Sequence, residues 1–173
     1  MTKAVCRLFG GAHYGLGHMM RLHRYIETNG IDAPLFIVNH DPQLIALLNR
    51  YGYAFRTADQ ANDLKVLLES EHSILDACSW FIDVKTDISD ELSIIRQLNG
   101  KHITLFDNTS PARLLADVNI YPTPLYCEDD LDWRGYKGKR FGGWEYTILG
   151  PSFDAEKARR TPWNRRQTIV ISF

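Results

Sequence analysis

Short apolar runs alternate with segments of helical periodicity along most of this 173-residue chain. Continuous apolar runs are typical of strands buried on both faces, whereas apolar positions spaced three or four residues apart indicate amphipathic helices. The pattern predicts strands at residues 3–9, 33–38, 53–56, 79–84, 102–106 and 117–121. It predicts helices at residues 17–29, 42–50, 62–71 and 89–98.

Local signals mark several ends of these helices. Pro42 favours the first position of a helix, and Gly52 favours its end. Ser89 is expected to cap the last predicted helix. Repeated alternation of strands and helices predicts an α/β fold, a Rossmann-like parallel sheet with helices on both faces. Ligands of such sheets bind at the carboxyl ends of the strands.

The pattern loosens beyond Tyr121, where prolines and glycines become frequent. The acidic residues at 128–132 and the basic residues at 137–140 are interpreted as solvated loop charges. Residues 168–173 form a fresh apolar run of the strand type. We therefore expect a Rossmann-like domain at residues 1–150, followed at residues 151–173 by a linker and the first strand of a second domain that is missing or swapped.

Composition narrows the class of protein. Apolar residues make up 45% of the chain, charged residues 24%, and the formal net charge is −1. These values are ordinary for a soluble globular protein and do not favour nucleic-acid binding. No apolar run is long enough for a membrane span, and the first residues lack the shape of a signal peptide. The three cysteines are widely spaced, so we expect a cytoplasmic protein with reduced thiols, no metal site and no cofactor.

A glycine loop between the first strand and the first helix is the strongest candidate for chemistry. Gly15 and Gly17 would let a ligand approach the backbone closely, and the helix start offers unpaired N–H groups. His18 lies on the first turn, where an imidazole can act as a general base. The alternative is a tight turn whose histidine caps the helix, and the residues of this loop leave both interpretations open.

Other nucleotide-binding loops fit less well. A dinucleotide fingerprint needs a third glycine, but Met20 stands there, and the second strand is followed by Asn39-His40 rather than by an acidic residue. A phosphate-binding loop of the Walker type would need a Gly-Lys-Ser/Thr sequence, which does not follow the glycines. An NAD-dependent oxidoreductase is therefore disfavoured.

Four further residues are candidates for contacts with substrate. Arg21 follows His18 by three positions, so both side chains leave the same face of the helix. Asp83 and Asp107 each follow a predicted strand, and either is a natural partner for Arg21. Tyr14 lies within the loop. The histidines at positions 23, 40, 72 and 102 are interpreted as surface or core residues.

Several short motifs, in this order and spacing, resemble those of a family of GT-B-fold proteins of nucleotide-sugar metabolism. The family includes the UDP-sugar hydrolase of pseudaminic acid synthesis and spore-coat polysaccharide proteins regarded as glycosyltransferases. The matching segments are the Gly-x-Gly-His-x-x-Arg loop at 15–21, the strand ends at 81–87 and 103–108, the segment at 116–120, the stretch at 143–153 and the run at 168–173. The resemblance implies the amino-terminal half of a GT-B architecture.

The resemblance also implies a function. A nucleotide-sugar, UDP- or CMP-linked, would be the ligand, and this domain would present the acceptor or water with His18 as base. The other half of the cleft would hold most of the nucleotide, so we expect the isolated chain to show little turnover. The alternative is a non-catalytic binding or assembly module, which could form a homodimer through its terminal strand.

Overall fold

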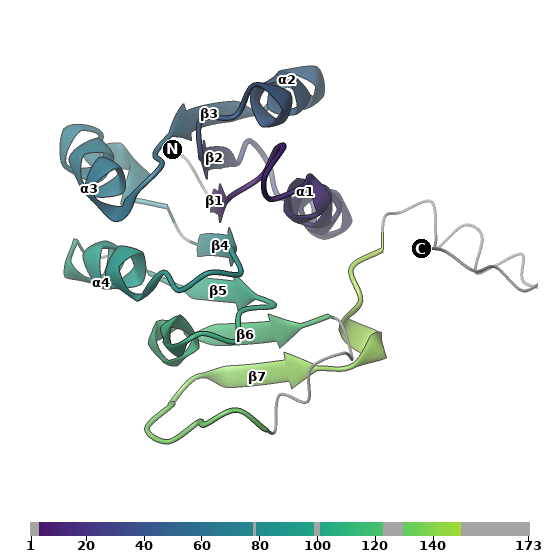
Figure 1. Cartoon of the computed structure of the whole chain (residues 1–173), viewed down its shortest axis with the longest axis vertical. Coiled ribbons are helices and arrows are strands. Elements are labelled where there is room, and N and C mark those ends of the chain that lie inside the picture. Colours follow the sequence, from purple (N-terminus) through teal and green to yellow (C-terminus); the bar gives the residue numbers. More distant parts are fainter. Residues whose placement is uncertain (1–3, 78, 99–100, 123–129, 150–173) are drawn as a thin grey trace, which may run out of the picture.

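Seven parallel strands form one sheet in the order β3-β2-β1-β4-β5-β6-β7 (Figure 1). The computed structural model describes residues 4–77, 79–98, 101–122 and 130–149. The strands are β1 (Ala4–Leu8), β2 (Leu35–Val38), β3 (Ala54–Thr57), β4 (Ser79–Asp83), β5 (Ile103–Phe106), β6 (Val118–Tyr121) and β7 (Lys139–Gly142). The predicted α/β, Rossmann-like fold class is confirmed.

Helices cover both faces of the sheet (Figure 1). Residues of α1 (Gly17–Asn29) and α2 (Pro42–Tyr51) share one apolar core, and residues of α3 (Ala61–Ser70) and α4 (Ser89–Gln97) share the other. Short 3₁₀ helices lie at η1 (His72–Ile74), η2 (Pro111–Leu115) and η4 (Trp144–Tyr146). Within the described residues, no helix has the length and apolar character that a bilayer crossing requires.

Alternate residues of each strand pack into different cores, because successive side chains point to opposite faces of the sheet. Val5 and the fully buried Trp80 face the core under α3 and α4. Cys6 and Phe81 face the core under α1 and α2. Burial raises the pKa of the Cys6 thiol, because the interior disfavours the thiolate. Cys6 is therefore a core residue without nucleophilic character.

The predicted helix ends are largely confirmed, with one correction. Gly52 ends α2 in the left-handed conformation, as expected. Ser89, predicted to cap α4, is instead its first helical residue, and its side chain does not cap the helix. The carboxylate of Asp87 accepts hydrogen bonds from the Ser89 N–H and hydroxyl at 3.0 and 2.6 Å. These bonds lower the pKa of Asp87, the hydroxyl contributing most.

Strand β7 was missed by the sequence reading. It lies in the stretch interpreted as loop and pairs with β6 in parallel, from Val118 opposite Lys139 to Tyr121 opposite Gly142. Its first two residues are charged and exposed, as is common in edge strands. A strand of this kind is therefore not recognised by a continuous apolar run. The predicted linker and strand at residues 151–173 lie outside the described residues and stay predictions.

A buried ion pair ties the central strand to α4. Arg7 of β1 is fully buried, and its Nε and Nη2 donate to the two carboxylate oxygens of Glu91 at 2.8 and 2.7 Å. Its Nη1 donates to the carbonyl oxygen of Ala58 at 2.9 Å. The guanidinium also lies 4.4 Å from the centre of the Phe9 ring. Every part of this cation is therefore matched within the interior.

Removing one partner should unfold the protein more easily, because the remaining charge stays buried without compensation. We expect Glu91→Ala to lower the free energy of unfolding by about 3–5 kcal/mol, measured by urea denaturation. Glu69→Ala is the matched control, because Glu69 is exposed and its carboxylate lies as far as 3.9 Å from Lys65 Nζ. This substitution should change the free energy of unfolding by no more than about 0.5 kcal/mol. Equal effects of the two substitutions would contradict the assignment.

Candidate functional site

The strand order places the glycine loop beside the end of β4. The chain first adds β2 and β3 on one side of β1, and then returns to add β4 and the later strands on the other side. The direction in which strands are added therefore reverses between β1 and β4. Crevices outside such a switch point are the usual ligand sites of open α/β sheets. The loop after β1 contains Gly15, Gly17 is the first residue of α1, and β4 ends on Asp83. Asp107 follows β5, the next strand in the sheet.

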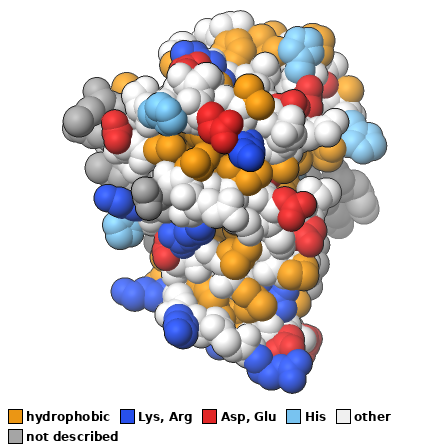
Figure 2. Space-filling view, turned by 90° about the vertical axis from the view of Figure 1, so that its left-hand side faces the viewer, with side chains coloured by type: hydrophobic (Ala, Val, Ile, Leu, Met, Phe, Trp, Pro, Cys, Tyr) orange, Lys and Arg blue, Asp and Glu red, His pale blue; other side chains and the backbone are white. Residues whose placement is uncertain are grey.

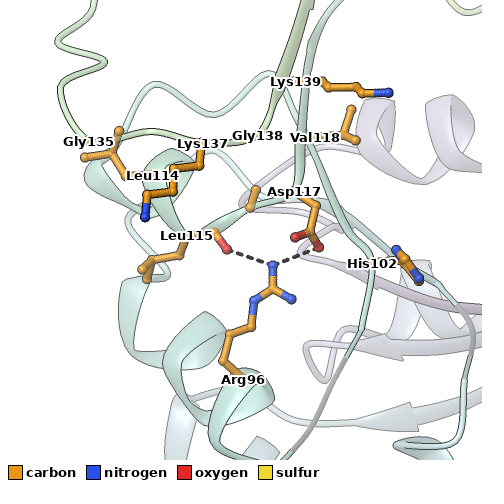
Figure 3. Close-up of a pocket in the computed structure, with 11 residues that line it drawn as sticks. Arg96, His102, Leu114, Leu115, Asp117, Val118, Gly135, Lys137, Gly138 and Lys139 are labelled. Atoms are coloured by element: carbon orange, nitrogen blue, oxygen red, sulfur yellow. Dashed lines mark hydrogen bonds and ion pairs between the residues drawn. The ribbon is translucent and has the colours of Figure 1, made fainter.

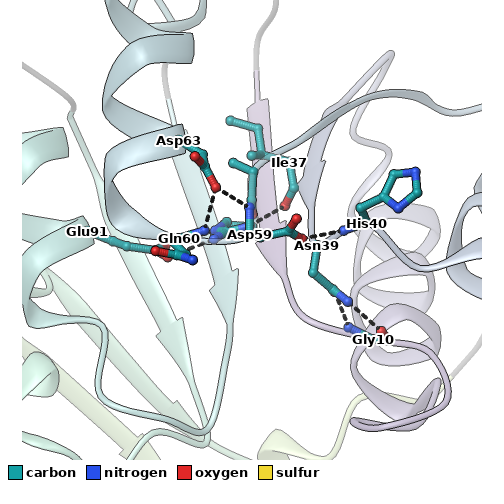
Figure 4. A network of polar contacts seen from close by, with 10 residues as sticks. Gly10, Ile37, Asn39, His40, Asp59, Gln60, Asp63 and Glu91 are labelled. Atoms are coloured by element: carbon teal, nitrogen blue, oxygen red, sulfur yellow. Dashed lines mark hydrogen bonds and ion pairs between the residues drawn. The ribbon is translucent and has the colours of Figure 1, made fainter.

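Hydrogen bonds hold the glycine loop in one shape. Gly11 and Gly15 exchange backbone hydrogen bonds of 3.0 and 2.7 Å, which close the loop between them. The Asn39 side chain accepts from the Gly10 N–H at 2.8 Å and donates to the Gly10 carbonyl oxygen at 3.0 Å. Figure 4 shows this pair of contacts at the end of β2. The start of the loop is thus fixed by the neighbouring strand.

Asp41 fixes both the loop and the next helix. Its carboxylate accepts from the N–H groups of Gln43 and Leu44 at the start of α2, and from the Ala12 N–H at 3.1 Å. These hydrogen bonds lower the pKa of Asp41, and those from the Leu44 and Ala12 N–H groups contribute most. The second strand is not followed directly by an acidic residue, as noted from the sequence, but the support of the loop by Asn39 and Asp41 was not predicted. Both residues follow β2, the strand beside β1, and this position could have indicated that they contact the loop after β1.

The predicted histidine and arginine meet the first predicted aspartate. His18 Nδ1 lies 2.7 Å from Asp83 Oδ1. Arg21 Nε lies 2.9 Å from Asp83 Oδ2, an ion pair rather than a well-aligned hydrogen bond. Asp83 is fully buried, whereas 12% of the His18 side chain and 17% of the Arg21 side chain are exposed. The carboxylate therefore lies beneath the two basic side chains.

The contact with Asp83 determines which ring nitrogen of His18 carries the hydrogen. Because a carboxylate only accepts, Nδ1 of the neutral imidazole carries the hydrogen, and Nε2 keeps its lone pair. Within the described residues, Nε2 has no hydrogen-bond partner. This arrangement of carboxylate, imidazole and free Nε2 is the one that general bases use.

Asp107 joins the same cluster through Arg21. Its Oδ2 lies 3.3 Å from Arg21 Nη1 and 3.5 Å from Lys85 Nζ. The residue is buried and adopts a left-handed backbone with φ of 53°, which aspartate tolerates better than most residues. Its Oδ1 is buried without a hydrogen-bond partner in the described part of the chain. Lys85 is the exposed cation of the cluster, with 52% of its side chain accessible.

A small hollow adjoins His18. Tyr14, Lys85 and Thr86 line it together with His18, and its volume of about 20 Å³ suffices for one water molecule. The exposed Tyr14 ring lies 5.4 Å from that of Phe9. Gly15 and Gly17 are exposed, and the space where each would carry a side chain is open. The structure thus gathers all seven predicted site residues at one edge; their contact with a substrate stays a prediction.

His23, on the same helix, is explained by packing. Burial and the nearby Glu27 charge raise the pKa of Tyr53 to about 12, so its hydroxyl stays protonated. The hydroxyl lies in hydrogen-bond contact with His23 Nδ1 at 2.8 Å, and the His23 ring stacks on Tyr51 with ring centres 4.0 Å apart. Its assignment as a structural histidine is supported by these contacts.

Comparison with known proteins gives no further assignment: no protein-family model matches the chain, and no curated protein is similar to it in sequence. Among the described residues, no group of three His, Cys, Asp or Glu side chains could hold a metal ion.

The loop shape yields a stability test with a matched control. At Gly11, φ is 103° and an added Cβ would lie 1.9 Å from Asp41 Cγ. At Gly17, φ is not positive and an added Cβ would meet no atom within 4 Å. We expect Gly11→Ala to lower the free energy of unfolding by about 1–3 kcal/mol and Gly17→Ala to change it by less than about 1 kcal/mol. Urea unfolding of both variants measures this, and a harmless Gly11→Ala would refute the loop assignment.

Proposed function

We propose that this chain binds a nucleotide-sugar at the switch-point edge and supplies the water or acceptor side of a hydrolase or glycosyltransferase-like active site. The observation that carries the proposal is the 2.7 Å contact between His18 Nδ1 and the buried Asp83 carboxylate. Supporting evidence is the position of this pair at the reversal of strand order, where α/β sheets bind their ligands.

The proposed reaction begins with proton transfer. His18 Nε2 takes a proton from a water or an acceptor hydroxyl, whose oxygen attacks the anomeric carbon of the sugar. The bond between that carbon and the phosphate oxygen of the nucleotide breaks, and the nucleotide leaves with the electron pair, as a nucleoside diphosphate from a UDP-linked sugar or as a nucleoside monophosphate from a CMP-linked one. Asp83 stabilises the imidazolium that forms and keeps the ring oriented. A positioned base of this kind contributes roughly 10²- to 10⁴-fold to the rate.

Asp83 acts in this scheme as a positioning residue. Its two oxygens face His18 and Arg21, and none of its side chain is exposed. We assign it the orientation of both basic groups rather than a direct contact with substrate, which refines the role expected from the sequence. Asp107 is assigned the same relation to Arg21 and Lys85.

The anionic part of the ligand has two supports. Lys85 is half exposed and lies beside the hollow at His18. The first turn of α1 offers backbone N–H groups and the positive end of the helix dipole, and Gly17 leaves its surface open. The resemblance of the loop at 15–21 to that of GT-B nucleotide-sugar proteins adds to this case. The same resemblance implies that a second domain would hold most of the nucleotide.

Binding is tested by following the His18 imidazole resonance during titration with UDP-N-acetylglucosamine and with a CMP-linked sugar. We expect a saturable shift for one of them, with no shift of the His23 resonance. Absence of any saturable response at about 10 mM of either ligand, a level that detects millimolar affinity, would overturn the proposal.

Turnover tests the role of the base. The rate of nucleotide release above background should fall by about 10²- to 10⁴-fold in His18→Gln and in Asp83→Asn. The first substitution removes the base, and the second removes the carboxylate that keeps its Nε2 unprotonated. His23→Gln is the control and should retain the wild-type rate, because His23 contacts Tyr51 and Tyr53 instead. Release that is unchanged in His18→Gln would contradict the mechanism.

A further inference from the structure

The phenol ring of Tyr14 is an exposed apolar surface beside His18. Tyr14 is 43% exposed, and it lines the same small hollow as His18. The next residue, Gly15, has no side chain, and no atom lies within 4 Å of the place where its Cβ would be. A single exposed ring is ordinary on a protein surface. This ring differs in its position at the ligand edge and in the way it is held.

Aromatic packing fixes the Tyr14 ring. Its centre lies 5.4 Å from that of Phe9 with the two planes tilted by 33°, and 4.8 Å from that of His13 with the planes at 90°. Phe9 in turn packs against the guanidinium of Arg7, which lies 4.4 Å from the centre of the Phe9 ring. Arg7 is held by Glu91. The Tyr14 ring is therefore connected through Phe9 to the buried ion pair of the core.

The backbone that carries the ring is also fixed. The two hydrogen bonds between Gly11 and Gly15 close the turn at residues 12–14. Within this turn, the Ala12 N–H donates to the Asp41 carboxylate at 3.1 Å. The Tyr14 ring is thus in place before a ligand arrives, which reduces the entropy lost on binding.

The opposite, amino edge of the sheet does not gather its described side chains in this way. At the groove beside the starts of β6 and β7, the ammonium groups of Lys137 and Lys139 point away from each other (Figure 3). Arg96 is engaged there, because it donates to the Leu115 carbonyl oxygen at 3.1 Å and pairs with Asp117 at 2.8 Å. Figure 2 shows the molecule from the side where β6 and β7 begin, with Lys and Arg side chains spread over its lower half. A base, a cation and an apolar surface lie together at the carboxyl edge instead.

A sugar ring suits an aromatic surface of this kind. The face of an aromatic ring carries the negative part of its quadrupole, and the C–H groups on one side of a pyranose present weakly positive hydrogens to it. In the proposed reaction, His18 activates the group that attacks the anomeric carbon. That carbon belongs to the sugar ring, whereas at least one phosphate separates it from the nucleoside. The sugar is therefore the part of the ligand expected next to Tyr14.

We propose that Tyr14 is a stacking platform for the sugar ring, so that the site selects a pyranose whose C–H groups gather on one face. This role rests on the proposed function and supplies the contact that distinguishes the sugar nucleotide from the free nucleotide. Tyr14 is a specificity residue in this scheme, because it touches the sugar and takes no part in the proton transfer.

Titration of the full chain with UDP-N-acetylglucosamine and CMP-N-acetylneuraminate, each beside its free nucleotide, tests this role. The sugar nucleotide that shifts the His18 resonance should bind more tightly than its free nucleotide, and its sugar C–H protons should move upfield in the ring current of Tyr14. Tyr14→Ala should weaken binding of the sugar nucleotide by about three- to tenfold. It should also abolish the upfield shift and leave the affinity for the free nucleotide unchanged. Tyr14→Phe keeps the ring face and should bind within about twofold of wild type.

Tyr146→Ala is the matched control. Tyr146 is 37% exposed and packs on Phe141 with ring centres 5.3 Å apart, much as Tyr14 packs on Phe9. It lies in η4 after β7, and β5 and β6 separate β7 from β4. Its substitution should leave the affinities for sugar nucleotide and free nucleotide within about twofold of wild type.

Three results would overturn the role of Tyr14. One is a sugar-nucleotide affinity that Tyr14→Ala leaves unchanged while the His18 shift persists, which would spare the proposed function. Another is an equal loss of affinity for the free nucleotide, which would put the ring against the nucleotide. The third is a loss in Tyr14→Phe as large as that in Tyr14→Ala, which would assign the contact to the hydroxyl. If neither sugar nucleotide shifts His18 in the wild type, the proposed function fails, and the role of Tyr14 fails with it.

Discussion

The Asp83 carboxylate is the centre on which the site depends. It is a full negative charge at the end of a buried strand, and it can stay there because His18 and Arg21 both reach it from the first turns of α1. The same contacts give each basic group its orientation. Without the carboxylate, the imidazole would lose its fixed tautomer and Arg21 one of its two partners. The glycine loop, held by Asn39 and Asp41, brings α1 to this position.

Two buried polar systems lie on opposite sides of the central strands. Arg7 and Glu91 form a closed pair under α3 and α4, in which the donors and acceptors of the two charges are matched. The cluster of His18, Arg21, Asp83 and Asp107 is different, because it reaches the surface and leaves His18 Nε2 and Asp107 Oδ1 without partners in the described chain. A matched pair stabilises the fold, whereas unmatched groups at a ligand edge are available for chemistry.

The sequence predicted most of the fold because the parallel strands are buried on both faces and so appear as apolar runs. The predicted bounds of α1 agree with the structure, and Asp83 and Asp107 lie at strand ends as expected. The partners of Arg21 were predicted, since an arginine near the switch point has few carboxylates in reach. Strand β7 was missed because an exposed edge strand need not be apolar. The pairing of Arg7 with Glu91 joins positions 84 residues apart, and no local pattern encodes it.

The central claim is that Asp83 fixes the tautomer of His18. The most direct measurement is the ¹⁵N chemical shifts of the His18 ring at alkaline pH, where the imidazole is neutral. The account predicts a protonated Nδ1 and an unprotonated Nε2 in the wild type, and loss of this preference when Asp83 is replaced by alanine. A neutral ring that carries its hydrogen on Nε2 in the wild type would contradict the account.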